Sequence, residues 1–345
     1  MPEAMAKRAE RAIEEKVFPG CVIGLIRTNG TRMVMPCGDL IYQISAPVAE
    51  NTVYDIASIT KSIPTASLAA MLMAEGKLTP ADNIREYLPE LKNDYDATIE
   101  DLLTYRVRGP QLSKLPFTTF EEIRTHVFER GFDGPPGERA YTNLPAFLLG
   151  IILEQISESS LAELAHKRLF EPFKMTQTTF FPSASDCAPT EIRECNREIP
   201  NSTSRYLGEK LSIGMETGQE IRGIVHDKSA RIFSRARRAV GHAGLFSTAG
   251  DLLNFLEALL RGDLPDVVLA AEKGWGWQVN AVFMGSHASA KTFGKTGFTG
   301  TSVVCDVGQG VAFVLLSNRT YPKRPPDDSA IQSFRSDIAD IILGS

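Results

Sequence analysis

Residues 301–317 read TSVVCDVGQGVAFVLLS, and this stretch decides the fold class. Two apolar runs, 301–306 and 311–317, are separated by the glycine-containing sequence VGQG. Apolar runs of this length bounded by glycines are typical of paired β-strands joined by a turn. The end of the chain is therefore predicted to contain an antiparallel β-hairpin.

The two ends of the chain mirror each other. The N-terminal region contains a short amphipathic helix over 5–13, an apolar strand over 21–26 and a return strand over 32–37. Asn29-Gly30 between the two strands is a strong hairpin signal. The order helix, strand, strand at the start and strand, strand, helix at the end favours one antiparallel sheet built from both ends. The C-terminal helix is predicted from apolar residues at helical spacing: Ile331, Phe334, Ile338 and Ile341.

The region between the ends is predicted to be mainly helical. One helix is expected over about 58–75, another over 144–156, and a third after the capping box formed by Thr248 and Asp251. Residues 183–240 hold few apolar clusters and are expected to form a long irregular connection. The predicted fold class is thus α/β (α+β), an antiparallel sheet flanked by helices plus an all-helical domain.

The length of the chain fits this division. A chain of 345 residues can hold one large domain or two packed ones. We predict an α/β sheet domain formed by residues 1–80 and 285–345, and a mainly helical domain formed by residues 81–284.

Composition and charge exclude several classes of protein. Hydrophobic residues make up 43% of the chain and charged residues 23%, which is ordinary globular composition and excludes wholesale disorder. The net charge of −5 argues against a nucleic-acid partner, which usually requires a basic excess. No apolar run approaches the roughly 18 residues of a membrane span, so no membrane-spanning segment is expected.

Cysteine and histidine patterns predict neither a disulfide framework nor a metal site. The five cysteines are scattered without a C-x-x-C pair, and the five histidines form no H-E-x-x-H sequence. The N-terminal stretch is charged and lacks the apolar region of a secretory signal. We therefore expect a cytoplasmic protein for the sequence as given, or a periplasmic or extracellular one if an export signal precedes it.

Three short motifs that carry chemistry occur once each and in order. Ser58–Lys61 is S-x-x-K at the predicted start of a helix, Tyr141–Asn143 is Y-x-N, and Lys295–Gly297 is K-T-G just before the terminal hairpin. Each motif alone is weak evidence, since chance supplies about one S-x-x-K in a chain of this length. The ordered set of three is far more specific.

These residue types fit acyl transfer to a serine. The Ser58 hydroxyl at a helix start is expected to lie beside free backbone N–H groups and the positive end of the helix dipole. Lys61, three residues on, brings its amine to that hydroxyl, and a serine becomes nucleophilic when a neighbouring base takes its proton. Burial and a second cation lower the pKa of a lysine toward that role, and Lys295 is expected to be this cation. Tyr141 is expected to relay the proton.

Other groups are expected to hold the substrate. The amide of Asn143 can bind a carbonyl or amide group, and the backbone N–H groups of Ser58 and Phe298 can form an oxyanion hole. Each motif also has a structural interpretation. Ser58 can be an N-cap with a solvated Lys61, Asn143 can cap the next helix beside a packed Tyr141, and K-T-G can be a turn into a strand. The joint occurrence of all three favours the catalytic interpretation.

With these motifs the sequence resembles the serine β-lactamase and penicillin-binding-protein superfamily, above all the class C β-lactamases, D-alanyl-D-alanine carboxypeptidases and β-lactamase-like esterases. The resemblance spans most of the chain, and 183–230 is the least matched part. The segments that carry it are YDIASITK at 54–61, EGKL at 75–78, YLPE at 87–90, GPPG at 134–137, YTN at 141–143, GHAGLFST at 241–248 and GKTGFTG at 294–300.

The resemblance implies a β-lactamase/transpeptidase-like fold with the active-site cleft between the sheet domain and the helical domain. It implies Ser58 as the nucleophile, Lys61 and Tyr141 as the base system, and Lys295 as an electrostatic and substrate-binding residue. No cofactor and no metal are expected. The remaining motif positions are expected to bind the substrate: Asn143, Thr296, Gly297 and Phe298.

One segment departs from the family pattern. Relatives often have an L-L-x-H-x-S-G-like loop beside the cleft, where this chain has LLTYRVRG at 102–109 with two arginines. This difference bears on the substrate preference. The retained Lys295 favours substrates with a carboxylate, such as peptides or β-lactams, whereas the absence of a recognisable export signal argues against them.

The sequence thus predicts a serine hydrolase that forms an acyl-enzyme with a small ester, amide or D-amino-acid peptide. The alternatives are a true class C-like β-lactamase, which must deacylate quickly, and a non-catalytic penicillin-binding or sensor module. The predicted partner is a small-molecule substrate, with no nucleic acid and no membrane span, and the oligomeric state stays open.

Three further features have two interpretations each. Basic residues crowd 228–238, where they either attract an anionic substrate or, as we favour, form a solvated surface. The sequence WGW at 275–277 either lines the cleft or packs as a turn. His242 lies in a glycine-rich loop and either reaches the site or, as we favour, has a structural role.

Overall fold

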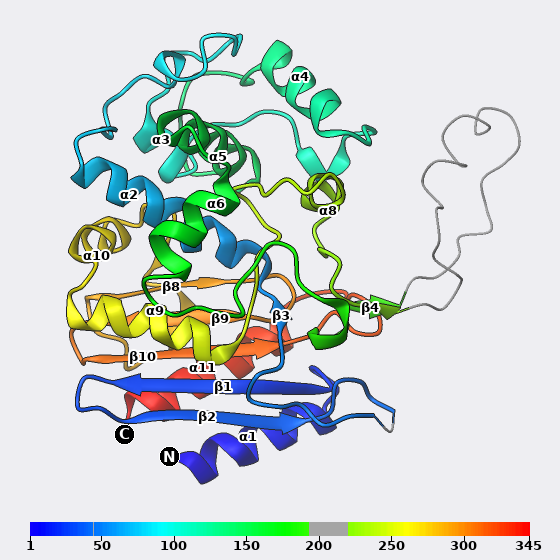
Figure 1. Cartoon of the computed structure of the whole chain (residues 1–345). Coiled ribbons are helices and arrows are strands. Elements are labelled where there is room, and N and C mark those ends of the chain that lie inside the picture. Colours follow the sequence, from blue (N-terminus) through cyan, green and yellow to red (C-terminus); the bar gives the residue numbers. More distant parts are fainter. Residues whose placement is uncertain (44, 193–219) are drawn as a thin grey trace, which may run out of the picture.

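The computed structural model describes residues 1–43, 45–192 and 220–345. Its largest sheet has six antiparallel strands in the order β2-β1-β10-β9-β8-β7 (Figure 1). Cys21 of β1 pairs with Ser317 of β10, so strands from the two chain ends are neighbours, which confirms the predicted sheet. The strands are β1 (Gly20–Arg27), β2 (Arg32–Gly38), β7 (Gln278–Val279), β8 (Thr292–Thr296), β9 (Ser302–Asp306) and β10 (Val311–Ser317).

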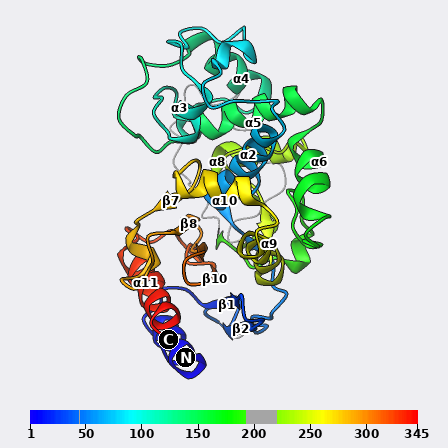
Figure 2. The ribbon, with the colours of Figure 1, turned by 90° about the vertical axis from the view of Figure 1, so that its left-hand side faces the viewer.

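Helices cover both faces of this sheet (Figure 2). The terminal helices α1 (Pro2–Glu14) and α11 (Ser329–Leu343) pack on one face, and α9 (Ala249–Arg261) packs on β1 and β10 from the other. Side chains of β1 alternate between the two cores, as the period of a strand requires. Cys21, Ile23 and Leu25 join the core of α1 and α11, whereas Val22 and Ile26 join the other core.

A mainly helical part of the chain packs above the sheet, around the central helix α5 (Leu144–Ser157), which carries apolar residues on nearly every side. Its interior forms one continuous hydrophobic core with the α9 face of the sheet. The other helices are α2 (Ser67–Ala74), α3 (Ile99–Leu103), α4 (Phe120–Arg130), α6 (Leu161–Ala165), α8 (Lys228–Arg235) and α10 (Pro265–Glu272).

Short strand pairs and helical turns complete the described chain. The strand pairs are β3 (Tyr54–Asp55) with β6 (Phe246–Ser247), and β4 (Glu191–Ile192) with β5 (Glu220–Ile221). The helical turns are η1 (Ala57–Lys61), η2 (Ser62–Ala66), η3 (Ile84–Glu86), η4 (Leu112–Lys114), η5 (His166–Phe170), η6 (Ala184–Asp186) and η7 (Val282–Met284).

The prediction of one continuous helix over 58–75 is wrong. The segment is divided into the 3-10 turn η1, the π-type turn η2 and the helix α2. The break lies at Ile63, whose backbone is extended at φ −115° and ψ 108°. A residue that precedes proline is disfavoured in the helical conformation, and Pro64 follows Ile63.

Two other local predictions need correction. Thr248 caps α9 by accepting a hydrogen bond from the Asp251 N–H (3.2 Å), but the Asp251 carboxylate does not return to Thr248. It accepts instead from the Gln177 N–H (2.7 Å), so it joins two segments of the chain. The expected irregular connection over 183–240 contains the helix α8, and its part over 193–219 lies outside the described residues.

Within the described residues, no single helix combines the length and apolar character needed to cross a membrane. The two segments 144–157 and 161–170 pass that test only when taken together, across a bend of 78°.

Candidate active site

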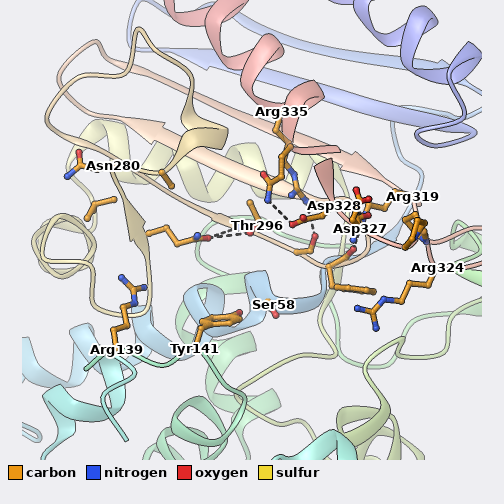
Figure 3. Close-up of a pocket in the computed structure, with 18 residues that line it drawn as sticks. Ser58, Arg139, Tyr141, Asn280, Thr296, Arg319, Arg324, Asp327, Asp328 and Arg335 are labelled. Carbon is orange, nitrogen blue, oxygen red and sulfur yellow. Dashed lines mark hydrogen bonds between the residues drawn. The ribbon is translucent and has the colours of Figure 1, made fainter. Parts of the chain in front are cut away.

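The three motifs converge on one cavity of about 630 Å³. Ser58 comes from η1, Tyr141 from the loop before α5, and Thr296 from the end of β8 (Figure 3). Gly297 and Phe298 also line this cavity, and its volume suits a small substrate. Lys61 and Lys295 lie buried behind Ser58 and Tyr141, each only 1% exposed. Among the predicted site residues, only Asn143 lies away from both the cavity lining and the lysine pair.

A buried carboxylate sets the conformation of the nucleophile segment. Asp55 accepts hydrogen bonds from the N–H groups of Ala57 (2.8 Å) and His226 (2.7 Å). Ala57 has a positive φ of 48°, which is uncommon for a residue other than glycine, asparagine or aspartate. This bend presents Ser58 at the cavity, and it is a local strain of the kind found at functional sites. The sequence motif alone did not indicate the role of Asp55.

Hydrogen bonds join this segment to the K-T-G turn. The Thr299 hydroxyl donates to the Asp55 carbonyl (2.6 Å) and the Thr301 hydroxyl donates to the Ile56 carbonyl (3.3 Å). A side chain at Gly297 would have no room, because a Cβ there would lie 2.5 Å from the Ile56 carbonyl oxygen. The glycine of K-T-G is thus required for the close approach of the two segments.

Lys61 contacts the Ser58 hydroxyl as its sequence spacing predicts. Its Nζ donates to Ser58 Oγ (3.0 Å) and to the backbone carbonyl of His242 (2.6 Å). The predicted helix dipole contributes little here, since Ser58 lies in a 3-10 turn of five residues that η2 does not continue as an α-helix. The environment of the nucleophile is therefore set by buried side chains.

Tyr141 lies between the two lysines. The Nζ of Lys61 is 5.3 Å and the Nζ of Lys295 is 4.6 Å from the centre of its ring. Burial of the phenol raises the pKa of Tyr141, but the positive charges of Lys61 and Lys295 outweigh this effect and lower the pKa to about 8. Tyr141 is therefore partly ionised near neutral pH, beside the Ser58 hydroxyl.

Lys295 is a buried cation, and no carboxylate of the described residues pairs with it. Its Nζ forms no hydrogen bond with a described residue and lies over the rings of Tyr141 and Tyr105 (5.2 Å from the latter). Burial and the nearby charge of Lys61 lower the pKa of Lys295 to about 8, although Tyr141 opposes this shift. A substrate carboxylate at this position would supply the missing partner.

Four arginines add positive charge to the cavity wall. The Arg319 Nε donates to the Phe298 carbonyl (2.9 Å). Arg335 donates to the carbonyls of Gly297 (2.9 Å) and Thr301 (2.7 Å), and burial lowers its pKa to about 9. These contacts brace the K-T-G turn from behind. The charged residues of the lining are Arg139, Arg319, Arg324, Arg335, Asp327 and Asp328 (Figure 3).

Sequence reasoning missed these arginines. Arg319, Arg324 and Arg335 belong to no motif and reach the cavity only because the chain returns to it after β10. One signal was available for Arg335, which occupies the apolar face of the C-terminal helix between Ile331 and Ile338. A charged residue on such a face is almost always paired or functional.

The backbone of the K-T-G turn supplies donors and acceptors. The Thr296 N–H donates to the side-chain oxygen of Gln278 (3.3 Å), and the Gly297 N–H donates to the Thr301 carbonyl (2.7 Å). The N–H groups of Ser58 and Phe298, the predicted oxyanion-hole donors, have no acceptor among the described residues. They are therefore available to a ligand in the cavity.

Asn143 is held by a carboxylate. Its Nδ2 donates to Asp227 Oδ2 (3.0 Å), and its side chain forms no capping bond with α5, so the alternative of a simple helix cap does not describe it. His242, for which a structural role is predicted, is fully buried and its side chain contacts Ser229 (2.9 Å). Its backbone carbonyl, however, holds Lys61.

The basic segment 228–238 and the sequence WGW at 275–277 contribute no residue to the cavity lining, and Arg235, Arg237 and Arg238 are exposed, as the favoured interpretation of a solvated surface expects. Arg231 and Arg238 of the basic segment pair with Glu191 and Glu154, and Arg238 lies over a phenylalanine ring. Trp277 is 1% exposed and stacks in the core, so it does not line the cavity. In the described parts of the chain, no three His, Cys, Asp or Glu residues gather closely enough to hold a metal ion.

The sequence and the fold of this chain are similar to those of known proteins. A family model described as Beta-lactamase matches residues 6–335. A relative from Escherichia coli (strain K12), named "Putative D-alanyl-D-alanine carboxypeptidase", is 28% identical over 82% of this chain and 73% of its own length. The solved structure of D-amino acid amidase from Ochrobactrum anthropi SV3 is similar with a TM-score of 0.76 at 17% identity, over 100% of this chain and 98% of that one. A β-lactamase/D-alanine carboxypeptidase from Pseudomonas syringae has a TM-score of 0.72 at 18% identity, over 97% of each chain.

Proposed function

The chain belongs to the beta-lactamase family and is a serine hydrolase of that family, and from this premise we propose that Ser58 forms an acyl-enzyme with an amide or peptide that carries a free carboxylate. One observation carries the proposal. Lys61 Nζ lies 3.0 Å from Ser58 Oγ, in one cluster with Tyr141 and with Lys295, whose Nζ has no hydrogen-bond partner within residues 1–43, 45–192 and 220–345.

The pKa of Tyr141 supports this residue as the general base. Lys61 Nζ contacts the Ser58 hydroxyl and the backbone carbonyl of His242, so it is placed to orient Ser58. With a pKa of about 8, the Tyr141 phenol is better matched to proton transfer near neutral pH than an ordinary tyrosine, whose pKa is about 10. We therefore assign proton abstraction to ionised Tyr141 and orientation of Ser58 to Lys61, which refines the predicted base system.

The proposed reaction has two halves. Tyr141 takes the proton of Ser58, whose Oγ bonds to the substrate carbonyl carbon, and the N–H groups of Ser58 and Phe298 stabilise the oxyanion. The tetrahedral intermediate breaks its bond to the leaving nitrogen, which takes the proton from Tyr141. A water molecule then loses a proton to Tyr141 and attacks the ester carbonyl. The bond from the carbonyl carbon to Ser58 Oγ breaks, and Oγ takes the proton back from Tyr141.

The charges of the cavity support a carboxylate-bearing substrate. Lys295 and the guanidinium groups of Arg319, Arg324 and Arg335 outnumber the carboxylates of Asp327 and Asp328, which leaves a positive balance at the K-T-G end of the cavity. The names of the E. coli relative and of the amidase structure agree with an amide or D-amino-acid peptide substrate.

A substrate panel combined with Lys295→Met tests this function. The pure protein is incubated with p-nitrophenyl acetate, a chromogenic cephalosporin and a peptide that ends in D-Ala-D-Ala, and product release and intact mass are followed. We expect turnover of the ester and the peptide, with an acyl adduct on Ser58. In Lys295→Met the ratio of peptide to ester kcat/KM should fall about 10- to 100-fold, as expected when a hydrogen bond to a charged group is lost.

The control is Lys273→Met, which removes an exposed lysine outside the cavity and should leave the ratio unchanged. Rapid turnover of the cephalosporin would identify a true β-lactamase instead. A stable Ser58 adduct without turnover would identify a sensor. No adduct with any compound would refute Ser58 as the nucleophile.

The pH profile should carry the signature of Tyr141 and Lys295. Ionised Tyr141 is the active base, so kcat/KM for the neutral ester should rise with pH through a midpoint near its pKa of about 8. Lys295 loses its charge above its own pKa of about 8, so the carboxylate-bearing peptide should give a bell-shaped profile. Because the two groups interact, the midpoints belong to the pair. An ester profile with its midpoint near 10, the ordinary pKa of tyrosine, would contradict the assignment.

A further inference from the structure

Asp227 joins three segments of the chain behind the site. Its Oδ1 accepts from the Ala230 N–H (2.9 Å), which caps α8, and its Oδ2 accepts from Asn143 Nδ2 (3.0 Å) of the Y-x-N motif. Its third link is to the 241–248 loop, since Oδ1 lies 3.5 Å from His242 Nε2. Oδ1 also accepts from the hydroxyl of Ser229 in α8 (2.7 Å). A single carboxylate thus contacts the helix, the motif and the loop.

The third link continues to the nucleophile. The Ser229 hydroxyl lies 2.9 Å from His242 Nε2, and the backbone carbonyl of His242 accepts the 2.6 Å hydrogen bond from Lys61. The imidazole of His242 is fully buried between the rings of Phe147 and Phe233, each 6.2 Å away centre to centre. The position of the His242 carbonyl therefore depends on the His242 side chain. Ring packing, Ser229 and Asp227 hold that side chain in place.

Asp227 is charged in this arrangement. Burial alone raises the pKa of its carboxyl, but His242 and the hydrogen bonds from Ala230 and Ser229 outweigh this effect and hold the pKa well below its usual range. A carboxylate only accepts hydrogen bonds, so it also fixes which end of the Asn143 amide faces it, namely Nδ2. The other end, Oδ1, is turned away from Asp227 and accepts no hydrogen bond from a described residue.

We propose that Asp227 is a positioning residue that, through His242, holds Lys61 Nζ against Ser58 and beside Tyr141. The proposal rests on the proposed function, because it gives Lys61 and Tyr141 their roles in activating Ser58. Asp227 itself touches no reacting atom. Its effect passes through the carbonyl of His242 and the position of the lysine.

The variant Asp227→Asn tests this role with little change in shape. Asparagine is as good an N-cap as aspartate, so the start of α8 is kept. The new amide lacks the negative charge that lies beside His242, and it can accept hydrogen bonds on only one of its two atoms. We expect the Lys61 Nζ to shift from its position beside Tyr141. Its positive charge should then lower the pKa of Tyr141 less than in the wild type. The charged or titratable groups around Tyr141 are Lys61, Lys295, Tyr105 and Arg139.

The decisive measurement is the ionisation of Tyr141, followed by tyrosinate absorbance in a pH titration. The wild type should show one step near pH 8 that is absent in Tyr141→Phe. In Asp227→Asn this step should move to higher pH, and kcat/KM for the ester should fall about 10- to 100-fold, as for a small displacement of a catalytic group. The matched control is Asp251→Asn, another buried aspartate near a helix start, where neither quantity should change.

The outcomes separate the two proposals. If the tyrosinate step of Asp227→Asn stays at the wild-type pH, or if Asp251→Asn moves it equally, the positioning role is overturned. A loss of activity with an unmoved step would also overturn it, because that result shows only a loss of structure. The titration needs no turnover, so an absent Ser58 adduct would refute the proposed function while the positioning of Lys61 beside Tyr141 is still measured.

Discussion

Ser58→Ala should abolish turnover of every substrate and prevent any acyl adduct. In serine hydrolases whose catalytic residues act as a unit, loss of the nucleophile costs about 10⁶-fold in kcat. The same magnitude is expected here because the cavity holds Ser58 Oγ within 3.0 Å of Lys61, and two backbone N–H groups beside it have no acceptor in the described part of the chain. The hydroxyl is small and at the cavity surface, so the variant should fold normally.

Intact mass after incubation with p-nitrophenyl acetate and rate of colour release measure the effect together. Ser185→Ala, which removes an exposed hydroxyl that lines no part of the cavity, is the control and should keep both. Turnover by Ser58→Ala above one part in a thousand, with an adduct on another residue, would show that the acyl group is carried elsewhere.

Lys61→Met should have the second largest effect, a fall in the acylation rate of up to about 10⁴-fold, the upper range for general base catalysis, because Lys61 supports the proton transfer from Ser58 to Tyr141. Two losses combine. The Ser58 hydroxyl loses the donor that orients it, and Tyr141 loses one of the two cations that lower its pKa. The unbranched methionine fits the buried stem of the lysine, but it leaves the His242 carbonyl unpaired at a cost of about 1–3 kcal/mol in stability.

The pH dependence distinguishes this effect from simple damage to the fold. Without Lys61 the pKa of Tyr141 should rise, so activity should recover in part as the pH approaches 10, the ordinary value for a tyrosine. Urea unfolding at neutral pH checks that the variant is folded. If Lys61→Met kept acylation within tenfold of the wild type at neutral pH, Lys61 would have no part in activation of Ser58.

Sequence patterns predicted the sheet because its signals are local. Each hairpin has apolar strands and a turn sequence, so β1, β2, β9 and β10 could be placed from short windows. The predicted helix after Ser58 is broken because Pro64 disfavours the helical conformation of Ile63, and the helical pattern of 58–75 does not show this restraint. The motif residues were found for the same local reason, because S-x-x-K, Y-x-N and K-T-G are each contiguous.

The rest of the site depends on contacts between distant segments. The sequence around Asp55 indicates only a strand, yet its carboxylate fixes the bend at Ala57 by accepting a hydrogen bond from the Ala57 N–H. Asp227 and His242 are fifteen positions apart and meet only because α8 and the following loop fold back on each other. Arg319, which follows β10, and Arg335, which lies within α11, both reach the K-T-G turn. No pattern within a short window contains these relationships.

The pairing of β1 with β10 determines when the sheet can form during synthesis and folding of the protein. The strand β1 must wait for β10, because Cys21 and Ser317 lie almost three hundred positions apart in the chain. Sheets closed by such distant partners fold slowly, since the entropy cost of closing a long loop comes before the contacts form. Ser58 is synthesised long before β10 and Arg335, and Arg335 braces the turn beside it. A nascent chain therefore carries its nucleophile before the residues that complete the site exist.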